Sequence, residues 1–482
     1  MERARQKKLH SIRIIITNIL MGVSVFAIVS ILILLAMGFT LTKDGGLERS
    51  GLLQVRSRPS GATVQINGQA QFSRTEMSKM LSEGNHDIVV TKTGYSTWTS
   101  SINIEAGLLT RIDWVRLFPL QRTVEDVHEY KSLKLVSTSL DKHYLALLPE
   151  NSTTLQLINI SSDDIKYSNI DLMSFLLTNG PFIETTADWS PSGLKITQWS
   201  ENHSKFLLKW NYSQDATHWY LVDVAKPENS INLTAKFAAN FTDLQIADPA
   251  ATKIWVTDSK NLRMIHTDTL TISGILLNNV EKFSSHANTI GFIGANSKGG
   301  RIVGIYQEDA KGSTTIHEIP DKISAAHIAL SANWLDNWVA YTLDNRLFVR
   351  AGNYPVYGSN VRLTTIAEND LDFTPVRLSA SPTGRFAVAS SEDQLTIIDA
   401  ELKNRADFAF PGPKLNWLDS HILWTDQDDQ LTIVDFNGEN RRNLTAIASG
   451  FDLALTTNNR WLYFLVPQPN EKPGFILQRE RL

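Results

Sequence analysis

Apolar residues form one long stretch near the start of the chain. No charged residue occurs from Ile14 to Thr42, and the 23 residues from Ile19 to Leu41 are almost all apolar. As an α-helix rising ~1.5 Å per residue, these residues span roughly 34 Å, enough to cross the ~30 Å hydrocarbon core of a bilayer. The pattern therefore predicts a transmembrane helix over residues 14–42.

The flanks of this stretch set its expected orientation. Residues 1–13 carry five basic side chains and one acidic side chain, so they are expected to stay in the cytoplasm, with everything after Lys43 outside. A cleaved signal peptide would have an apolar region of only about 7–15 residues, and a buried soluble helix would need a polar face. We therefore expect a retained single-pass anchor in a cell membrane, followed by a polar linker at residues 43–50.

Strand-like alternation of apolar and polar positions begins directly after the linker. Leu53 and Val55 alternate with polar neighbours, and Val64 and Ile66 do the same. Further strand-like runs lie at residues 86–92, 98–104 and 110–118. The stretch TEMSKMLS, residues 75–82, is expected to form a short helical turn or a loop. These elements predict a small β domain over residues 51–119.

The turns of this domain use residues with defined backbone preferences. Pro59 holds the residue before it extended, and Gly61 allows a sharp reversal. Asn67 and Gly68 form the pair that a tight hairpin requires, because both accept positive φ angles. On physical grounds alone, these residues shape the backbone.

The order of these residues resembles the PEGA domain family. The resemblance is carried by VRSRPSGATVQINGQ, LSEGNHDIVVTKTGYSTW and INIEAG. The matching positions are Pro59, Gly61, Ala62, Val64, Ile66, Asn67, Gly68, Gly84, Gly94 and Tyr95. The chain departs from the family at Ser60, where the motif has glutamate, and it lacks the usual Thr-Pro pair near residue 75. The resemblance implies a non-catalytic β-sandwich on a microbial surface protein, used for spacing or adhesion.

The region from residue 120 to the end repeats a turn between two apolar strands. Two versions have Ser-Pro-x-Gly, with Ser190, Pro191 and Gly193 in the first and Ser381, Pro382 and Gly384 in the second. Weaker copies lie at residues 139–147, 247–256, 284–293, 332–341, 416–424 and 456–465. The spacing of these turns is that of four-stranded propeller blades, and it predicts eight blades, with seven as the alternative.

Second hairpins follow most of these turns, and QLTIVDFNGENRRNLT is an example. The region over residues 120–482 therefore resembles a TolB-type or WD-repeat-like β-propeller. The last blade offers three strands only. Because a ring with an open edge leaves backbone groups unpaired, a segment around residues 125–131, or the strand just after it, is expected to supply the fourth strand. The expected fold class is all-β, apart from the single N-terminal helix.

The composition of the chain excludes several kinds of chemical site and partner. The chain has no cysteine, which excludes disulfides, thiolate metal sites and a cysteine nucleophile. Its formal net charge is -4 and its basic residues are scattered after residue 43, so no nucleic-acid partner is expected. The eleven histidines are spread singly along the sequence, and satisfied or exposed single histidines are the expectation. No metal site and no cofactor are predicted.

Several local patterns contain residue types that also occur at chemical sites. Asp426, Asp428 and Asp429 lack the glycine and distal glutamate of a calcium loop, so a solvated turn is preferred. The glycine-rich residues 291–300 open no helix and are a weak phosphate-site pattern. Tryptophans at strand positions are expected to pack in the core: Trp189, Trp255, Trp338, Trp424 and Trp461. No Gly-x-Ser-x-Gly elbow occurs, and no catalytic residue is assigned.

The expected function follows from the architecture. The chain is expected to be a membrane-anchored, extracytoplasmic binding or scaffolding protein of a microbial, bacterial-type cell envelope. In this hypothesis the PEGA-like domain is a spacer, and the propeller binds an envelope protein or glycan. The alternative is an envelope glycan hydrolase or lyase with its site in the propeller funnel, which would need carboxylates converging there from different blades.

Overall fold

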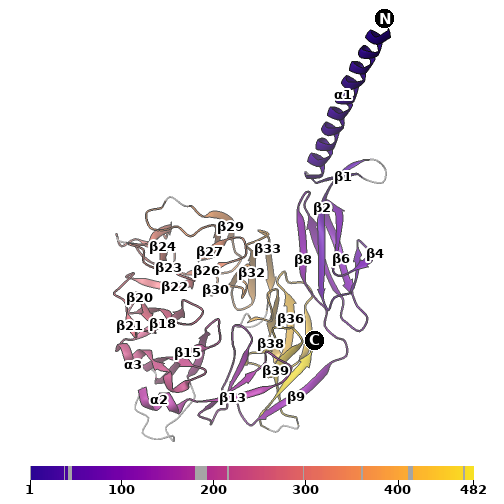
Figure 1. The fold of residues 1–482 in the computed structure, drawn as a ribbon. Coiled ribbons are helices and arrows are strands. Elements are labelled where there is room, and N and C mark those ends of the chain that lie inside the picture. The colour runs from indigo at the N-terminus through magenta and orange to yellow at the C-terminus, as the bar shows by residue number, and fades with distance from the viewer. Residues whose placement is uncertain are drawn as a thin grey trace. The chain divides into compact units, whose positions relative to one another are not determined.

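The computed structural model describes residues 2–36, 38–41, 46–179, 193–213, 216–296, 298–359, 362–410, 416–469 and 473–482. The chain divides into two compact units, Met1–Gln121 and Arg122–Leu482, which are described separately below. Figure 1 shows the first as a long helix with small sheets and the second as a ring of sheets.

The first unit begins with one long helix, α1 (Glu2–Ala36). Its segment Ile16–Leu34 has a mean hydropathy of 2.4, and its side chains are not buried against other parts of the chain. The helix ends at Ala36, before the predicted end at residue 42. Gly38 has a left-handed φ of +83°, the conformation with which glycine commonly ends a helix. The expected linker at 43–50 is also shorter, because Leu47 already starts a strand.

Two four-stranded sheets follow in this unit, as predicted for a small β-sandwich. The first sheet contains β1 (Phe39–Leu41), β2 (Leu47–Arg58), β5 (Met77–Ser82) and β8 (Leu109–Arg116); the second contains β3 (Thr63–Ile66), β4 (Gln69–Arg74), β6 (Gly84–Thr91) and β7 (Trp98–Ile104). Alternate residues on β2 and β3 are buried, including Val55 and Val64, so the period-2 pattern identified the core faces correctly.

The prediction of a helical turn or loop at residues 75–82 is wrong. Met77–Ser82 form β5, which pairs antiparallel with β2 along Ser50–Val55. Met77 and Leu81 are buried while residues between them stay accessible. Pairing with β2 satisfies the backbone here, and this long-range contact is not visible in the local sequence.

The second unit contains eight four-stranded antiparallel sheets within its described residues. Blades 1 to 4 contain β10 (Leu135–Thr138), β11 (Tyr144–Leu148), β12 (Thr154–Asn159) and β13 (Lys166–Asp171); β14 (Leu194–Trp199), β15 (Lys205–Ser213), β16 (Ala216–Asp223) and β17 (Ile231–Asn232); β18 (Phe241–Ile246), β19 (Lys253–Asp258), β20 (Asn261–His266) and β21 (Thr271–Ile272); and β22 (Val280–His286), β23 (Thr289–Ala295), β24 (Arg301–Gln307) and β25 (Thr314–Glu318).

The remaining blades have the same plan. Blades 5 to 8 contain β26 (Ala326–Ala332), β27 (Asn337–Leu343), β28 (Arg346–Ala351) and β29 (Thr364–Asp370); β30 (Arg377–Ala380), β31 (Phe386–Ser390), β32 (Gln394–Asp399) and β33 (Arg405–Ala409); β34 (Asn416–Trp417), β35 (Ile422–Thr425), β36 (Gln430–Asp435) and β37 (Arg442–Ala446); and β38 (Ala454–Leu455), β39 (Trp461–Pro467) and β40 (Phe475–Arg481). Short helices lie at α2 (Met173–Asn179) and α3 (Leu233–Phe237). The eight-bladed β-propeller predicted from the repeat is confirmed.

The ring closes through a strand from the start of the unit. β9 (Thr123–Tyr130) pairs antiparallel with β40 and becomes the fourth strand of blade 8, as predicted for this segment. An ion pair supports the seam, because the Arg122 guanidinium donates to the Glu480 carboxylate at 2.7 and 2.5 Å. Side chains of blade 8 then pack on blade 1, where Tyr463 and Leu477 share a core with Leu145.

Position within the blade decides how each strand is buried. The second strands are almost wholly buried, as in the run Phe386–Ser390 of β31, because neighbouring blades cover both of their faces. The outer strands stay largely exposed, as in β13. The first strands of neighbouring blades contact one another around the ring, including β22 with β26 and β26 with β30. These first strands surround the axis of the propeller, and their ends define its two faces.

We name the two faces by their loops. One face carries the beginnings of the first strands and the turns between the second and third strands. We call it the pocket face, because the cavity described below opens on it. The opposite face carries the turns between the first and second strands. The alternating direction of antiparallel strands places these loops on opposite sides of the ring.

Candidate functional site

A cavity of about 820 Å³ opens on the pocket face. It lies where the first strands of blades 3 to 6 begin, so four consecutive blades contribute to its wall. Phe283, Ile328 and Leu378 give the wall its apolar part and are themselves buried. Cavities of roughly 300–1,000 Å³ are typical of small-ligand sites. The volume and the position near the ring axis make this the leading candidate site.

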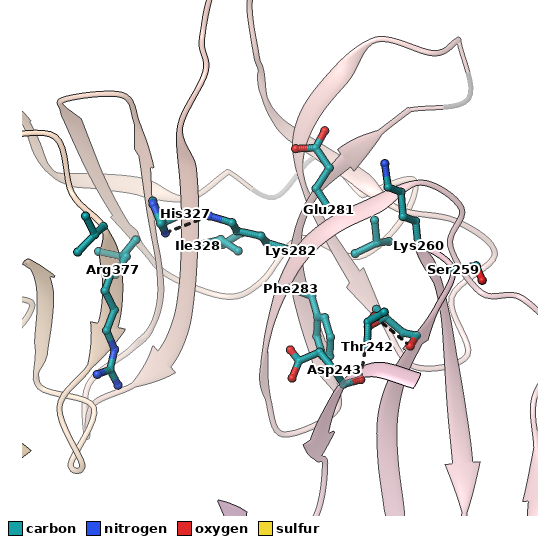
Figure 2. Close-up of a pocket in the computed structure, with 14 residues that line it drawn as sticks. Thr242, Asp243, Ser259, Lys260, Glu281, Lys282, Phe283, His327, Ile328 and Arg377 are labelled. Atoms are coloured by element: carbon teal, nitrogen blue, oxygen red, sulfur yellow. Dashed lines mark hydrogen bonds between the residues drawn. The ribbon is translucent and has the colours of Figure 1, made fainter. Parts of the chain in front are cut away.

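Charged side chains of both signs line this cavity. They are Asp243, Lys260, Glu281, Lys282, His327 and Arg377. Each comes from the beginning of a first strand, except Lys260, which follows β19 in a turn. Figure 2 shows Lys282 and His327 pointing toward each other from β22 and β26, and their Nζ and Nδ1 atoms are 3.3 Å apart. The ammonium of Lys282 donates to the ring of His327, which favours the neutral imidazole.

The two acidic groups of the cavity differ in their surroundings. Glu281 is held by the Arg301 guanidinium, whose Nε lies 3.0 Å from Oε1 and whose Nη2 lies 2.7 Å from Oε2. Arg301 also donates to the Ile323 carbonyl at 2.7 Å, which fixes the guanidinium in place. Asp243 keeps contact with solvent, and Gln245 Nε2 is 3.3 Å from its Oδ2. The charge of Glu281 is thus largely balanced, whereas Asp243 has a weaker, neutral partner.

Partial loss of hydration shifts the pKa of three groups that line the cavity, although the side chains of Asp243 and Lys282 stay exposed. Loss of hydration raises the pKa of Asp243 above its usual range, although hydrogen bonds from Gln245 and the Leu244 backbone oppose the shift. Loss of hydration also lowers the pKa of Lys282. The pKa of His327 is lowered first by burial and then by the nearby charge of Lys282. Clusters of perturbed groups in a cavity are typical of functional sites.

A second cluster lies on the opposite face. Asp141 and His143 belong to the turn between β10 and β11 of blade 1, and His203 belongs to the equivalent turn of blade 2. One possible ligand atom from each residue lies within 4.8 Å of the others. Burial lowers the pKa of His143, and the neighbouring His203 lowers it further. The expectation of single, separate histidines therefore fails here, because ring geometry brings two turns together.

The PEGA-like motif residues all serve the backbone or the core of the first unit. Ala62, Val64 and Ile66 are buried on and beside β3. Positive φ angles occur at Gly61, Asn67, Gly68, Gly84 and Gly94. Pro59 follows β2, and Tyr95 forms an isolated bridge with Pro119. Their placement agrees with a structural role for this motif.

The side chain of Asn67 also forms hydrogen bonds with a neighbouring strand. Its side-chain oxygen accepts from the Asp87 N–H at 2.9 Å, and its amide nitrogen lies 2.9 Å from His86 Nδ1. The hairpin at Asn67 and Gly68 is therefore tied to β6, the next strand in its sheet.

The two Ser-Pro-x-Gly sequences do not occupy equivalent places. Ser381, Pro382 and Gly384 form the turn between β30 and β31, as predicted, and Ser381 Oγ accepts from the Phe386 N–H at 3.0 Å. Ser190 and Pro191 lie outside the described residues. Gly193 directly precedes β14, the first strand of blade 2, so the predicted equivalence is wrong.

The turn between the first and second strands of blade 2 is Ser200–Ser204. Ser200 Oγ accepts from the Lys205 N–H there, at 3.0 Å, just as Ser381 does for Phe386 in blade 6. The prediction missed this turn because its Pro and Gly are replaced by Glu201, Asn202 and His203. A serine hydroxyl that accepts from the backbone N–H five residues later identifies this turn better than the Pro and Gly positions do.

The other local patterns have structural explanations. Asp426 Oδ2 accepts from the Gly450 N–H at 2.6 Å, so part of the aspartate cluster fixes a neighbouring loop. Gly291 and Gly294, in the glycine-rich stretch, lie in β23, and a Cβ at Gly291 would come within 2.0 Å of a Leu330 methyl. Trp255, Trp338, Trp424 and Trp461 are buried, which confirms their core role. Trp189 lies outside the described residues.

Sequence reasoning did not single out the residues that line the cavity. They are spread from residue 242 to residue 378, and no short motif connects them. One signal was present: Lys282, His327 and Arg377 each stand at the start of an apolar first strand. An alignment of the blades by their first strands would have placed these side chains at one end of the ring.

Comparison with known proteins identifies the small domain. Residues 50–116 match the model of the PEGA domain family. This confirms the resemblance seen in the motif residues, and the match covers both sheets of the first unit except β1 and the first residues of β2. Among curated proteins, none matches this sequence.

Solved structures with similar folds include several propellers. The C-terminal WD40 domain of Sif2 is 12% identical, with 75% of this chain and 99% of that chain covered and a TM-score of 0.44. Apo AztD from Citrobacter koseri is 11% identical, with 82% and 96% covered and a TM-score of 0.39. An oligogalacturonate lyase in complex with manganese is 11% identical, with 59% and 87% covered and a TM-score of 0.39. Because these TM-scores are below 0.5, the number of blades is taken from the strand pairing alone.

Proposed function

We propose that the chain is a membrane-anchored binding protein of a microbial cell envelope. The helix within residues 14–42 anchors it, residues 1–13 stay in the cytoplasm, and the remainder lies outside. The domain of residues 51–119 is a spacer close to the membrane, and the propeller of residues 120–482 binds an envelope protein or glycan. The length and hydropathy of Ile16–Leu34 and the basic flank support this topology.

The observation that carries the binding role is the cavity of about 820 Å³ on the pocket face. Its wall comes from four blades. Apolar side chains in the wall give contact area, and the charged side chains that line the cavity give orientation. This combination is typical of a preformed ligand site.

The balance of charge in the cavity favours a ligand with acidic groups. Arg301 already neutralises Glu281, while Lys260, Lys282 and Arg377 face the cavity. Only Asp243 opposes them, and burial raises the pKa of that carboxyl. Acidic groups on an envelope glycan or protein would therefore be attracted to the basic side chains of this cavity.

A capture experiment tests the binding role. The full-length protein in detergent is immobilised and incubated with solubilised envelope, with and without soluble envelope glycan as a competitor. We compare the wild type with Lys282→Ala and Arg377→Ala, and with Lys311→Ala as the control. Lys311 is an exposed lysine on the opposite face of blade 4, the blade that also contains Lys282.

The outcomes separate the alternatives. We expect one partner to be retained by the wild type and by Lys311→Ala, and to be lost from both pocket variants. Release by free glycan assigns the partner as a glycan, and retention assigns it as a protein. Equal capture by all four proteins would contradict a role for the pocket.

The second candidate function is a glycan hydrolase or lyase at the same place. It is favoured by two groups that line the same cavity: Asp243, whose pKa is raised by loss of hydration, and Lys282, whose pKa is lowered. A hydrolase needs two carboxylates, and the pairing of Glu281 with Arg301 weakens that version. A lyase needs a base, a role open to Lys282 or His327. Incubation with envelope polysaccharide, followed by assay of new reducing ends, tests both versions. Loss of such activity in Asp243→Asn or Lys282→Ala would replace the binding proposal.

A further inference from the structure

Two turns on the opposite face of the propeller bring imidazole and carboxylate groups together. Asp141 and His143 come from blade 1, and His203 comes from blade 2, 62 residues after Asp141. One nitrogen or oxygen from each residue lies within 4.8 Å of the other two. The three side chains are half-buried, so solvent and small ions reach them. This cluster lies at the other end of the ring from the cavity.

The three groups are in direct contact with one another. His203 Nδ1 is hydrogen-bonded to Asp141 Oδ2. The rings of His143 and His203 are stacked, with centroids 4.1 Å apart and planes inclined by 4°. The stacking and the hydrogen bond hold two imidazole rings next to one carboxylate.

The local turns fix these side chains before any ligand arrives. Asp141 Oδ1 accepts from the Ser139 hydroxyl at 2.7 Å and from the His143 N–H at 3.2 Å, which leaves Oδ2 toward His203. His143 Nε2 lies 3.0 Å from Asn159 Nδ2, and the Asn159 oxygen accepts from the Ser161 N–H. Supporting hydrogen bonds of this kind orient ligands in metal sites.

The lysine of this turn contacts another blade. Lys142 stands between Asp141 and His143 in the sequence, and its Nζ donates to the Leu418 carbonyl of blade 7 at 3.1 Å. Across the junction of blades 1 and 2, the side-chain partner of the Asp141 carboxylate is His203.

We infer that Asp141, His143 and His203 form a site for a divalent transition metal ion of the Zn²⁺ class. Two imidazole nitrogens and one carboxylate oxygen are the donor set that zinc accepts, with the fourth position left to water or an external ligand. Hard ions such as Ca²⁺ prefer six to eight oxygen ligands and should bind poorly here. The site would join blade 1 to blade 2.

The adjustment required for binding is small. Tetrahedral coordination with bonds of about 2.0–2.1 Å places ligand atoms roughly 3.4 Å apart, so the widest of the present separations, at most 4.8 Å, must shorten by no more than about 1.4 Å. The proton on His203 Nδ1 passes to solvent when a metal ion replaces it beside Asp141. The Asn159 amide gives up His143 Nε2 if the metal takes that lone pair.

Titration of the full-length protein with Zn²⁺ tests the site. The protein is purified in detergent without an oligohistidine tag, and binding is followed by calorimetry with Zn²⁺ and, separately, with Ca²⁺. His143→Gln and His203→Gln each remove one nitrogen ligand. His266→Gln is the matched control, because His266 is a half-buried histidine of the same unit outside the cluster. Melting curves without metal establish that each variant is folded.

The expected result is one Zn²⁺ per wild-type chain and no binding of Ca²⁺. Each ligand variant should weaken Zn²⁺ binding by more than about tenfold, and His266→Gln should not. Visible absorption of added Co²⁺ provides a measurement on the wild type alone, with bands of four-coordinate geometry expected. Absence of Zn²⁺ binding, equal binding by the ligand variants, or purely octahedral Co²⁺ spectra would each overturn the inference.

Discussion

Closure of the propeller through β9 and β40 makes a quantitative prediction for Leu477→Ala. Leu477 lies on β40, the third strand of blade 8, and is 1% exposed. It packs with Leu145 and Leu147 of blade 1 and with Tyr463 of its own blade. The substitution therefore removes packing at the junction where the last blade meets the first.

The size of the effect follows from the burial. Loss of three buried carbon groups at ~0.8 kcal/mol each, with a further contribution from the cavity that remains, gives a destabilisation of about 3 kcal/mol. An unfolding entropy of about 2.1 cal/mol/K per residue over residues 122–482 converts this into a fall in melting temperature of about 4 °C. The whole ring should be affected, because its blades are joined in a closed cycle.

Thermal unfolding monitored by circular dichroism measures this change, and Leu347→Ala is the matched control. Leu347 is fully buried on β28, the third strand of blade 5, far from the seam in sequence. We expect similar shifts for the two variants and one cooperative transition in each. A normal shift for Leu347→Ala with no shift for Leu477→Ala would refute closure. Removal of residues 473–482 should lower the melting temperature further, and unchanged melting would refute closure as well.

Three further predictions concern stability. Gly384→Ala should cost at least about 2 kcal/mol in urea unfolding, because φ is +71° and the new Cβ would lie 1.9 Å from the Ala332 carbonyl oxygen; an unchanged midpoint would contradict this. Arg122→Ala should cost about 3 kcal/mol by leaving the Glu480 carboxylate buried and unpaired, and adding Glu480→Gln should recover part of the loss; no recovery would contradict the ion-pair explanation. Lowering the pH from about 7.5 to 5.5 should lower the melting temperature. Burial depresses the pKa of five histidines, so the unfolded chain binds more protons below pH ~6.5 and stability falls there; a pH-independent melting temperature would contradict this. These histidines are His143, His218, His286, His317 and His327.

Local sequence was sufficient where one element determines its own conformation. Asn67 and Gly68 both adopt positive φ, as their hairpin required. The apolar stretch gave a helix, although Gly38 ended it earlier than hydropathy alone suggested. The repeated turns predicted eight blades because each blade is a local meander of four strands.

Local sequence failed where a distant strand decided the outcome. Residues 77–82, within the segment expected to be a helical turn or loop, became β5 because β2 offered an unpaired edge, and no pattern within those residues specifies that partner. The turn of blade 2 was misplaced because Glu201 and His203 stand at the Pro and Gly positions, although Ser200 accepts the same backbone hydrogen bond as Ser381 does in blade 6.

The sequence by itself determined the apolar helix, the small β domain, a propeller with eight blades favoured over seven, and the need for a closing strand. These features depend on periodicity and on turn residues, which act over a few neighbouring positions. Only the tertiary structure decided which side chains meet. Lys282 reaches His327 across the junction of blades 4 and 5, and Asp141 reaches His203 across the junction of blades 1 and 2. Both encounters depend on the rotation between successive blades, which results from side-chain packing around the whole ring and not from any local pattern.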